Sequence, residues 1–262
     1  AIEDTHPEKA KALRLGIPVV HRAELLAAIC RSKRSIAIAG TSGKSTVTAM
    51  LFHILEVNHL HPSLISGAGL VSLQRQGKIG NACYGEGEWL VMEADESDGT
   101  LVHYAPEIGV LLNIDRDHKE VDELIQLFAQ FRQHTRGAFL TNQAHALSRA
   151  LTLRPEWTFG EGSALYGTDF QQQGFQIQFS VQETRFTIPA IGRHSMENAL
   201  AATAAALQTG LRIDQAASAL ATYPGIYRRH QLLGTHKGIT VIDDYAHNPA
   251  KIAASIRACQ PI

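Results

Sequence analysis

One short run contains the residues whose types and spacing are best suited to chemistry: Gly40-Thr41-Ser42-Gly43-Lys44-Ser45-Thr46. An apolar stretch at 35–39 precedes it and predicts a buried strand, while residues 47–57 predict a helix. In a glycine-rich turn between a strand and a helix, backbone N–H groups and the helix dipole favour bound phosphate. Lys44 could then reach the outer phosphates, and the Ser45 hydroxyl could hold magnesium. The run therefore predicts a nucleoside triphosphate site.

The run departs from the common phosphate-loop pattern at one position. That pattern, G-x-x-x-x-G-K-[ST], has its first glycine where this chain has Ile38, whereas Gly43, Lys44 and Ser45 keep its second half. The alternative is an ordinary turn between a strand and a helix, with a solvated lysine. The place of the run Gly40 to Thr46 between a predicted strand and a predicted helix favours the phosphate site.

A group of acidic residues follows the apolar residues 89–92. Glu93, Asp95, Glu96 and Asp98 place four carboxylates within six residues at the end of a predicted strand. Ligands of parallel sheets bind at the carboxyl ends of strands, where a carboxylate beside a phosphate loop can hold magnesium. We predict Glu93 as the metal ligand because it directly ends the apolar stretch. Asp95 or Asp98 could instead cap a helix.

A second polar group follows the apolar residues 110–112 at the end of another predicted strand. It contains Asn113, Asp115, Asp117 and His118. A neutral imidazole beside carboxylates could bind a second divalent ion.

Three later positions carry side chains that suit a nucleotide. The Asn198 amide could pair with an adenine edge, or it could cap the alanine-rich helix predicted there. Arg228 and Arg229 could clamp a γ-phosphate, or they could form a solvated basic turn. Asp244 and His247 follow another predicted strand, again at its carboxyl end.

Composition limits the class of protein and its partners. The chain has 262 residues, 45% hydrophobic and 19% charged, which is typical of a soluble α/β protein with one large or two small domains. Its formal net charge is −1, so no electrostatic attraction to nucleic acid or anionic membranes is expected. Apolar runs fall short of the roughly 18 residues of a membrane span. Three widely spaced cysteines fit a reducing cytoplasm.

The periodicity predicts an α/β fold: a P-loop-type, mostly parallel sheet with helices on both faces. Strands are predicted over 36–39, 64–66, 89–93, 108–114, 138–141 and 239–243, with a short one at 19–20. Helices are predicted over 7–15, 23–30, 46–57, 121–134, 143–151, 197–208, 213–222 and 249–258. Alternating residues over 170–181 and 184–188 predict a small antiparallel hairpin.

The order of these motifs resembles that of the Mur ligases of peptidoglycan synthesis. The motifs are, in order, G-T-S-G-K-S-T, E-A-D-E-S-D, N-I-D-R-D-H, G-R-H-S-M-E-N-A-L-A-A, R-R and D-D-Y-A-H-N-P. The second and the last are the most specific. The resemblance covers nearly the whole chain, and it is closest to the members that use L-alanine or murein tripeptide.

The resemblance implies a cytoplasmic, ATP-dependent ligase that forms an amide bond and acts as a monomer or weak homodimer. A UDP-N-acetylmuramate-type carboxylate would attack the γ-phosphate of ATP, and the amine of an amino acid (L-alanine) or a peptide would displace phosphate from the acyl phosphate. The alternatives are a Mur-like ligase of the murein tripeptide recycling, folylpolyglutamate or cyanophycin type, and a non-catalytic ATP-binding module.

The resemblance also implies roles for single residues. Lys44 would hold the β- and γ-phosphates, Ser45 and Glu93 would bind Mg²⁺, and His118 would bind a second Mg²⁺. Asn198 would contact adenine, Arg229 the γ-phosphate and Asp244 the ribose, while His247 and Asn248 would line the nucleotide cleft. One departure is Ser195, which stands where the family has the first Asn of H-N-x-x-N.

The implied domains are of unequal completeness. Residues 1–33 would be the tail of an N-terminal UDP-substrate-binding domain, 34–223 the central ATP-binding domain, and 224–262 the start of a C-terminal amino-acid-binding domain. Both ends would then be truncated relative to the family. Because catalysis requires the domains to close together, this chain alone is expected to bind ATP and to turn over slowly or not at all.

Overall fold

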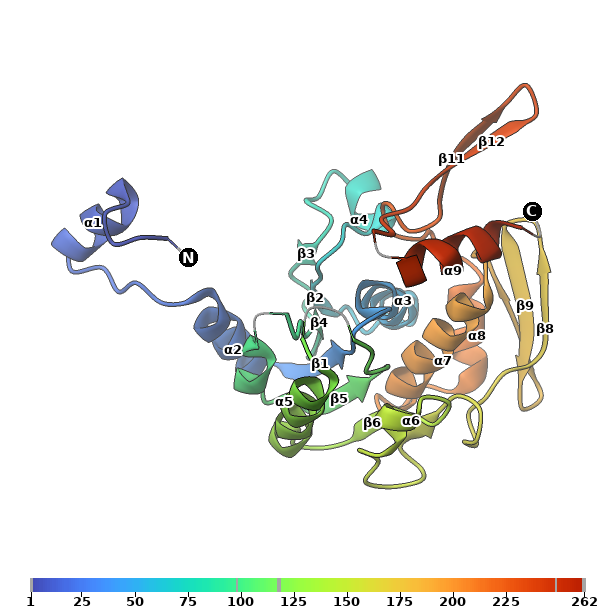
Figure 1. Ribbon diagram of the computed structural model, residues 1–262, viewed down its shortest axis with the longest axis horizontal. Helices are drawn as coiled ribbons and strands as arrows, with labels where there is room; N and C mark the ends of the chain where they lie inside the picture. Colours follow the sequence, from blue (N-terminus) through green and yellow to red (C-terminus); the bar gives the residue numbers. More distant parts are fainter. Residues whose placement is uncertain (1, 98, 117–118, 248, 261–262) are drawn as a thin grey trace.

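The computed structural model describes residues 2–97, 99–116, 119–247 and 249–260 (Figure 1). Helices and strands alternate through most of these ranges. The helices are α1 (Pro7–Arg14), α2 (Arg22–Ser32), α3 (Lys44–Val57), α4 (Val71–Arg75), the 3-10 helix η1 (Thr100–His103), α5 (Val121–His134), α6 (Ala146–Arg149), α7 (Arg193–Leu207), α8 (Ile213–Leu220) and α9 (Pro249–Cys259). The strands are β1 (Arg34–Ala39), β2 (Ser63–Ile65), β3 (Ala82–Cys83), β4 (Trp89–Glu93), β5 (Ile108–Leu111), β6 (Phe139–Asn142), β7 (Thr158–Phe159), β8 (Thr168–Gln173), β9 (Gln176–Val181), β10 (Thr184–Ile188), β11 (Gln231–His236) and β12 (Ile239–Asp243).

A seven-stranded sheet lies at the centre, in the order β3-β2-β4-β1-β5-β6-β7. Neighbouring strands are parallel except for β2 and β3, which are antiparallel. β1 is the middle strand, where Ile36 pairs with Val91 of β4 on one side and with Ile108 of β5 on the other. The carboxyl ends of β4, β1 and β5 therefore lie next to one another at one edge of the sheet.

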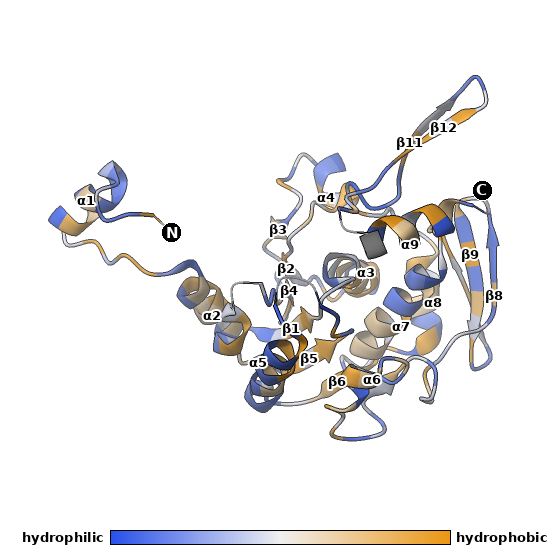
Figure 2. Cartoon of the chain, in the orientation of Figure 1, coloured by the Kyte–Doolittle hydropathy of each residue, from blue (hydrophilic) through white to orange (hydrophobic). Residues whose placement is uncertain are grey.

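Successive residues of β1 face opposite layers of helices. Ile36 and Ile38 belong to the apolar cluster that includes α3 and α7, whereas Ala37 and Ala39 belong to the cluster that includes α2 and α5. All four side chains are fully buried. Figure 2 shows hydrophobic strands between helices, which confirms the predicted α/β fold with helices on both faces.

The alanine-rich helix α7 packs against α3 and joins the main sheet to a smaller one. Its buried face consists largely of alanines, which lets neighbouring elements approach closely. The smaller sheet, in the order β10-β9-β8, is antiparallel and packs near α7 and α8. Phe179 and Phe186 stack within it at 4.9 Å between ring centroids. The predicted antiparallel hairpin is thus present and has a third strand.

The last described residues form the β11–β12 hairpin and α9. The hairpin extends away from the rest of the chain in Figure 1, and its Leu233 and Ile239 side chains are exposed. α9 is tied to the smaller sheet, because Gln172 Nε2 donates a hydrogen bond to the Ala258 carbonyl at 2.9 Å.

Some predicted boundaries are wrong. Residues 17–20 form no strand and lie exposed before α2, because no neighbouring strand pairs with them in the described structure. The helix expected over 143–151 shortens to α6, since Ser148 Oγ turns to the Leu111 carbonyl and Asn142 Oδ1 accepts from Ala144 N. The strands β3, β7 and β11 and the short helices α4 and η1 were not predicted. β3 and β7 have two residues each, too few for a periodic pattern, and β11 is defined by its pairing with β12.

Within the described residues, no helix has the length and apolar character needed to cross a membrane.

Candidate functional site

The run from Gly40 to Thr46 joins the carboxyl end of β1 to the N-terminus of α3. Gly40 and Gly43 have φ values of 138° and 88°. A Cβ added at Gly40 would lie 3.0 Å from the Leu112 Cβ, and one added at Gly43 would lie 2.6 Å from Asn198 Oδ1. Both positions therefore require glycine. Ile38, at the usual first-glycine position, is buried in β1, so Gly40 makes the turn instead.

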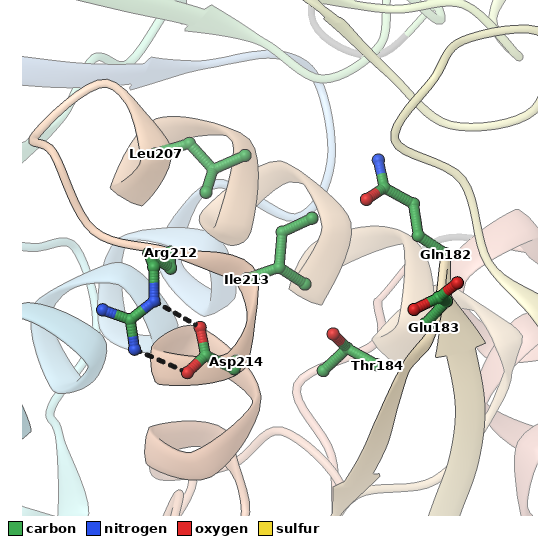
Figure 3. Close-up of a pocket in the computed structure, with 7 residues that line it drawn as sticks. All are labelled: Gln182, Glu183, Thr184, Leu207, Arg212, Ile213 and Asp214. Atoms are coloured by element: carbon green, nitrogen blue, oxygen red, sulfur yellow. Dashed lines mark hydrogen bonds and ion pairs between the residues drawn. The ribbon is translucent and has the colours of Figure 1, made fainter.

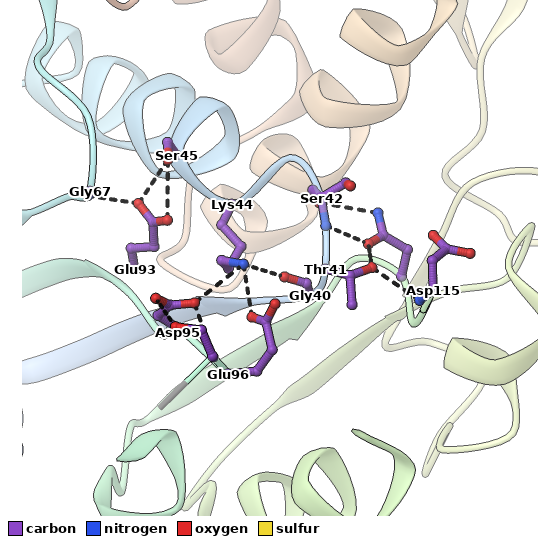
Figure 4. Close-up of polar contacts among 12 residues, drawn as sticks. Gly40, Thr41, Ser42, Lys44, Ser45, Gly67, Glu93, Asp95, Glu96 and Asp115 are labelled. Carbon is purple, nitrogen blue, oxygen red and sulfur yellow. Dashed lines mark hydrogen bonds and ion pairs between the residues drawn. The ribbon is translucent and has the colours of Figure 1, made fainter. Parts of the chain in front are cut away.

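Lys44 lies across this loop, and its ammonium group donates hydrogen bonds to the protein. Its Nζ donates to the Gly40 carbonyl and to Glu96 Oε2, each at 2.8 Å, and lies 3.6 Å from Asp95 Oδ1 (Figure 4). The Glu96 side chain is only 4% exposed. Burial raises the pKa of Glu96, and the charge of Lys44 opposes that rise. The sequence placed Glu96 among the four acids, but it did not identify this residue as the partner of Lys44.

Glu93 and Ser45 meet at the other side of the loop. Ser45 Oγ donates to both Glu93 carboxylate oxygens at 3.1 and 3.0 Å, and Gly67 N donates to Oε2 at 2.7 Å (Figure 4). Carboxylate and hydroxyl oxygens are the hard donors that magnesium prefers, and magnesium usually keeps further water and phosphate ligands. The donor set therefore fits Mg²⁺. The described residues contain no group of three or more His, Cys, Asp or Glu side chains that could hold a metal by itself.

Asn113 holds the loop from the end of β5. Its Oδ1 accepts from Thr41 Oγ1 at 2.9 Å and from Ser42 N at 2.8 Å, while its Nδ2 donates to the Ser42 carbonyl at 3.1 Å. The Asp115 backbone N donates to Thr41 Oγ1 at 3.0 Å, next to these bonds (Figure 4). The sequence placed Asn113 at this edge of the sheet, but the clamp on the loop was missed. The strand order, which puts β5 beside β1, is the signal that would have revealed it.

Helix α7 contacts both the loop and the linker of residues 221–230, which lies between α8 and β11. Asn198 approaches Gly43, and one turn earlier the His194 ring lies 5.1 Å from the His230 ring in the linker. Residues four apart share one face of a helix. Asn198 lies in the second turn of α7, whose N-cap is Gly192, so it is not a helix cap.

Ser195 is not directed at the loop. It stands where the family motif has Asn, its side chain is buried, and Oγ donates to the Ile191 carbonyl at 2.7 Å. This bond satisfies the hydroxyl locally, at the start of α7.

The linker is also anchored to the loop whose Gly67 bonds the Glu93 carboxylate. Leu70 and Ile226 form an antiparallel bridge, and both side chains are buried. The loop that contains Leu70 also contains Gly67, whose N–H holds Glu93. The segment that leads to Arg229 and the predicted metal ligand are therefore both attached to the loop that contains Gly67 and Leu70.

The other predicted residues of this region, Arg229 and Asp244, contact their neighbours in the linker and in the segment after β12. Asp244 Oδ2 accepts from His230 N and Oδ1 from Ala246 N, each at 2.9 Å. The Arg229 guanidinium lies 5.4 Å from the centre of the Tyr245 ring. Burial lowers the pKa of His230 and is the main reason why the pKa of His194 falls to about 4.

The structure thus gathers the predicted site into two parts joined by α7. Loop residues Thr41, Ser42, Gly43, Lys44 and Ser45 lie together with Glu93 and Asn198. The second part consists of Arg229, Asp244 and the exposed His247. Their contacts in the described residues are with the linker and the segment after β12. Thr46 is half-buried in the first turn of α3. Four predicted residues, Asp98, Asp117, His118 and Asn248, lie outside the described residues.

A separate recess lies at the other end of α7, between the β9–β10 turn and the start of α8 (Figure 3). Its most polar wall is the exposed pair of Arg212 and Asp214, which bond each other at 2.7 Å. These charges satisfy one another, so the recess offers no convergent chemistry comparable to the loop.

A lysine, a hydroxyl and a carboxylate at the carboxyl edge of a parallel sheet, around a glycine loop that opens a helix, define a phosphate-loop α/β domain. Comparison with known families shows which family of this class the chain belongs to. The Mur ligase middle domain matches residues 38–206, and the chain belongs to the Mur ligase family.

Several relatives have the same kind of name. UDP-N-acetylmuramate–L-alanine ligases of Acidithiobacillus ferrooxidans and Streptomyces avermitilis are 38% and 39% identical, over 100% and 98% of this chain. The chain spans 60% and 58% of the length of these two curated relatives.

Solved structures show the same fold. The UDP-N-acetylmuramate–alanine ligase of Thermotoga maritima matches with a TM-score of 0.87 at 24% identity, over 100% of this chain and 62% of that one. A murein peptide ligase of Psychrobacter arcticus matches with a TM-score of 0.74 at 24% identity, over 98% of this chain and 61% of that one.

Proposed function

We propose that this chain is the ATP-binding and carboxylate-activating part of an amide-forming ligase of peptidoglycan synthesis. The observation that carries the proposal is the convergence of Lys44, Ser45 and Glu93 around the loop of a Mur ligase middle domain. Phosphoryl transfer needs the charge on the transferred group to be neutralised and the reactants to be positioned. The site contains the groups suited to both tasks.

Each residue would act through groups that the structure describes. The Lys44 ammonium and the first-turn N–H groups of α3 would bind the outer phosphates of ATP. Ser45 and Glu93 would hold Mg²⁺, which would neutralise phosphate charge when bound. Asn113 would keep the loop in the shape that presents its N–H groups.

The remaining roles follow the family pattern. Asn198 would contact adenine, Asp244 the ribose, Arg229 the γ-phosphate and His118 a second Mg²⁺, with His247 and Asn248 lining the cleft. The Arg229 guanidinium lies against the Tyr245 ring, so it would reach the phosphates through movement of the linker.

The substrates proposed are a UDP-N-acetylmuramate-type carboxylate and L-alanine, in the cytoplasm. Support comes from the two relatives described above, 38% and 39% identical, which are named UDP-N-acetylmuramate–L-alanine ligases. The carboxylate would attack the γ-phosphate to form an acyl phosphate, and the amine would then displace phosphate. Residues 1–33, 34–223 and 224–262 would be parts of the UDP-substrate, ATP and amino-acid domains.

A chimaera tests this proposal. The chain would replace the matched 60% of the Acidithiobacillus ferrooxidans ligase, and phosphate release would be measured with ATP, Mg²⁺, UDP-N-acetylmuramate and L-alanine. We expect phosphate release that requires all four, and that falls at least about 100-fold in the same chimaera with Lys44→Ala, as for loss of a main charge-stabilising group. A chimaera that shows a cooperative thermal melt but releases phosphate no faster than the Lys44→Ala form would contradict the proposal.

A further inference from the structure

The Lys44 ammonium group is shared between the loop and a buried acid. Its Nζ is 2.8 Å from the Gly40 carbonyl and 2.8 Å from Glu96 Oε2. The lysine side chain is 12% exposed and that of Glu96 is 4% exposed. A phosphate that binds this ammonium must therefore compete with a carboxylate that is already in hydrogen-bond contact and shielded from water.

The charges around the loop are unbalanced. Three carboxylates lie at the end of β4, those of Glu93, Asp95 and Glu96, and Lys44 is the cation that contacts two of them. An excess of negative charge opposes the approach of a polyphosphate, and the effect is strongest for a buried carboxylate because water screens it least.

Glu96 and Asp95 differ in how tightly they engage the lysine. Asp95 is half-exposed, lies 3.6 Å from Nζ, and accepts hydrogen bonds from the N–H and hydroxyl of Ser97. Glu96 is buried, and its Oε2 accepts a hydrogen bond from the Lys44 ammonium at 2.8 Å. The two acids therefore form a matched pair for experiment, with one strong and one weak competitor on the same strand end.

Stability alone does not explain the pair. A buried ion pair is often no more stabilising than apolar residues of the same size, since both ions lose their hydration. Lys44 would also keep its bond to the Gly40 carbonyl without Glu96. The feature specific to a carboxylate is that it holds the ammonium by charge, at the place where phosphate must act.

We propose that Glu96 is a positioning residue that holds Lys44 against the loop and competes with the outer phosphates of the nucleotide for the lysine ammonium group. This inference rests on the proposed function, because it assumes that ATP binds at this loop. Glu96 would thereby lower the affinity for ATP and make binding depend more strongly on Mg²⁺, whose charge offsets the carboxylates.

The test compares ATP and AMP binding to the 262-residue chain by isothermal titration calorimetry, with Mg²⁺ and with EDTA. The variants are Glu96→Gln, which keeps the shape of the side chain and removes its charge, and Asp95→Asn. In EDTA we expect Glu96→Gln to bind ATP about tenfold more tightly than the wild type, and Asp95→Asn to gain about twofold or less, as expected for buried and exposed charges. Added Mg²⁺ should reduce the difference in ATP affinity between Glu96→Gln and the wild type. AMP, whose single phosphate does not reach Lys44, should bind each protein equally.

Other results overturn the inference in different ways. ATP affinity that stays the same or falls in Glu96→Gln would show that the acid does not compete for Lys44. Equal changes for ATP and AMP would show an effect on the fold of the site. A wild-type chain that binds neither nucleotide would instead contradict the proposed function. It would then also contradict the proposed competition between Glu96 and phosphate for Lys44.

Discussion

At the scale of single residues, the site depends on short-range geometry that residue types alone do not reveal. The sequence identified Lys44, Ser45 and Glu93, because charge and hydroxyl groups at this spacing suit phosphate and magnesium. It did not reveal that Asn113 clamps the loop or that Glu96 pairs with Lys44, since both contacts depend on which strands are neighbours. The functional roles of Lys44, Ser45 and Glu93 stay predictions, as do those of Arg229, Asp244 and His118.

The close contact between Gly43 and Asn198 gives a prediction at this scale. Gly43→Ala introduces a Cβ at φ 88° that would lie 2.6 Å from Asn198 Oδ1. We expect the free energy of unfolding to fall by about 2–4 kcal/mol, the sum of backbone strain and overpacking. Urea denaturation measures this change.

Gly77→Ala is the matched control. Gly77 has a φ of 75° but open space around its Cβ position, so only the backbone strain of about 1 kcal/mol should remain. In an Asn198→Ala background, Gly43→Ala should lose most of its additional cost, because the next atom, Leu112 Cδ1, lies 3.2 Å from the added Cβ. Equal losses at the two glycines, or no relief from Asn198→Ala, would contradict the packing described here.

At the scale of elements, α7 links the phosphate loop to the linker. Asn198 lies at Gly43, and His194, one turn earlier, lies against His230. The sequence predicted this helix from its alanines, and it predicted the buried strands β1, β4 and β5 from their apolar runs. It missed β3, β7, β11 and the shortened α6, because strand pairing and side-chain bonds decide these elements rather than periodicity.

The burial of His194 predicts a pH dependence of stability. Burial favours the neutral ring, and the pKa of His194 is about 4 in the folded chain against about 6.5 when unfolded. The stabilisation of the folded chain by the neutral His194 ring is complete above pH 6.5. It is lost as the pH falls toward 4, because the unfolded chain binds a proton on His194 at a higher pH than the folded chain does. Between pH 7.5 and 5.0, the wild type should lose about 2 kcal/mol more free energy of unfolding than His194→Gln.

Urea denaturation at the two pH values checks this expectation. Taking the difference between wild type and variant cancels the titration of groups that behave alike in both proteins. His103→Gln, at an exposed position, should keep the pH dependence of the wild type. Equal losses in the wild type and in His194→Gln would show that the ring is not held neutral at the start of α7.

At the scale of the whole molecule, a seven-stranded sheet presents the carboxyl ends of β4, β1 and β5 at one edge, and the polar groups of the loop gather there. The sequence predicted this α/β architecture because buried parallel strands have long apolar runs. The β11–β12 hairpin and α9 remain on the periphery, and the chain spans about 60% of the curated relatives. We therefore propose ATP binding as the step to test on this chain by itself.

Calorimetric titration of the chain with ATP and Mg²⁺ addresses that step. We expect one saturable site per chain, with affinity reduced at least about 100-fold in Lys44→Ala, the loss of roughly 3 kcal/mol that fits one main phosphate contact. A wild-type chain without measurable heat of binding, or a Lys44→Ala chain that binds with unchanged affinity, would contradict the assignment of Gly40 to Thr46 as the phosphate site.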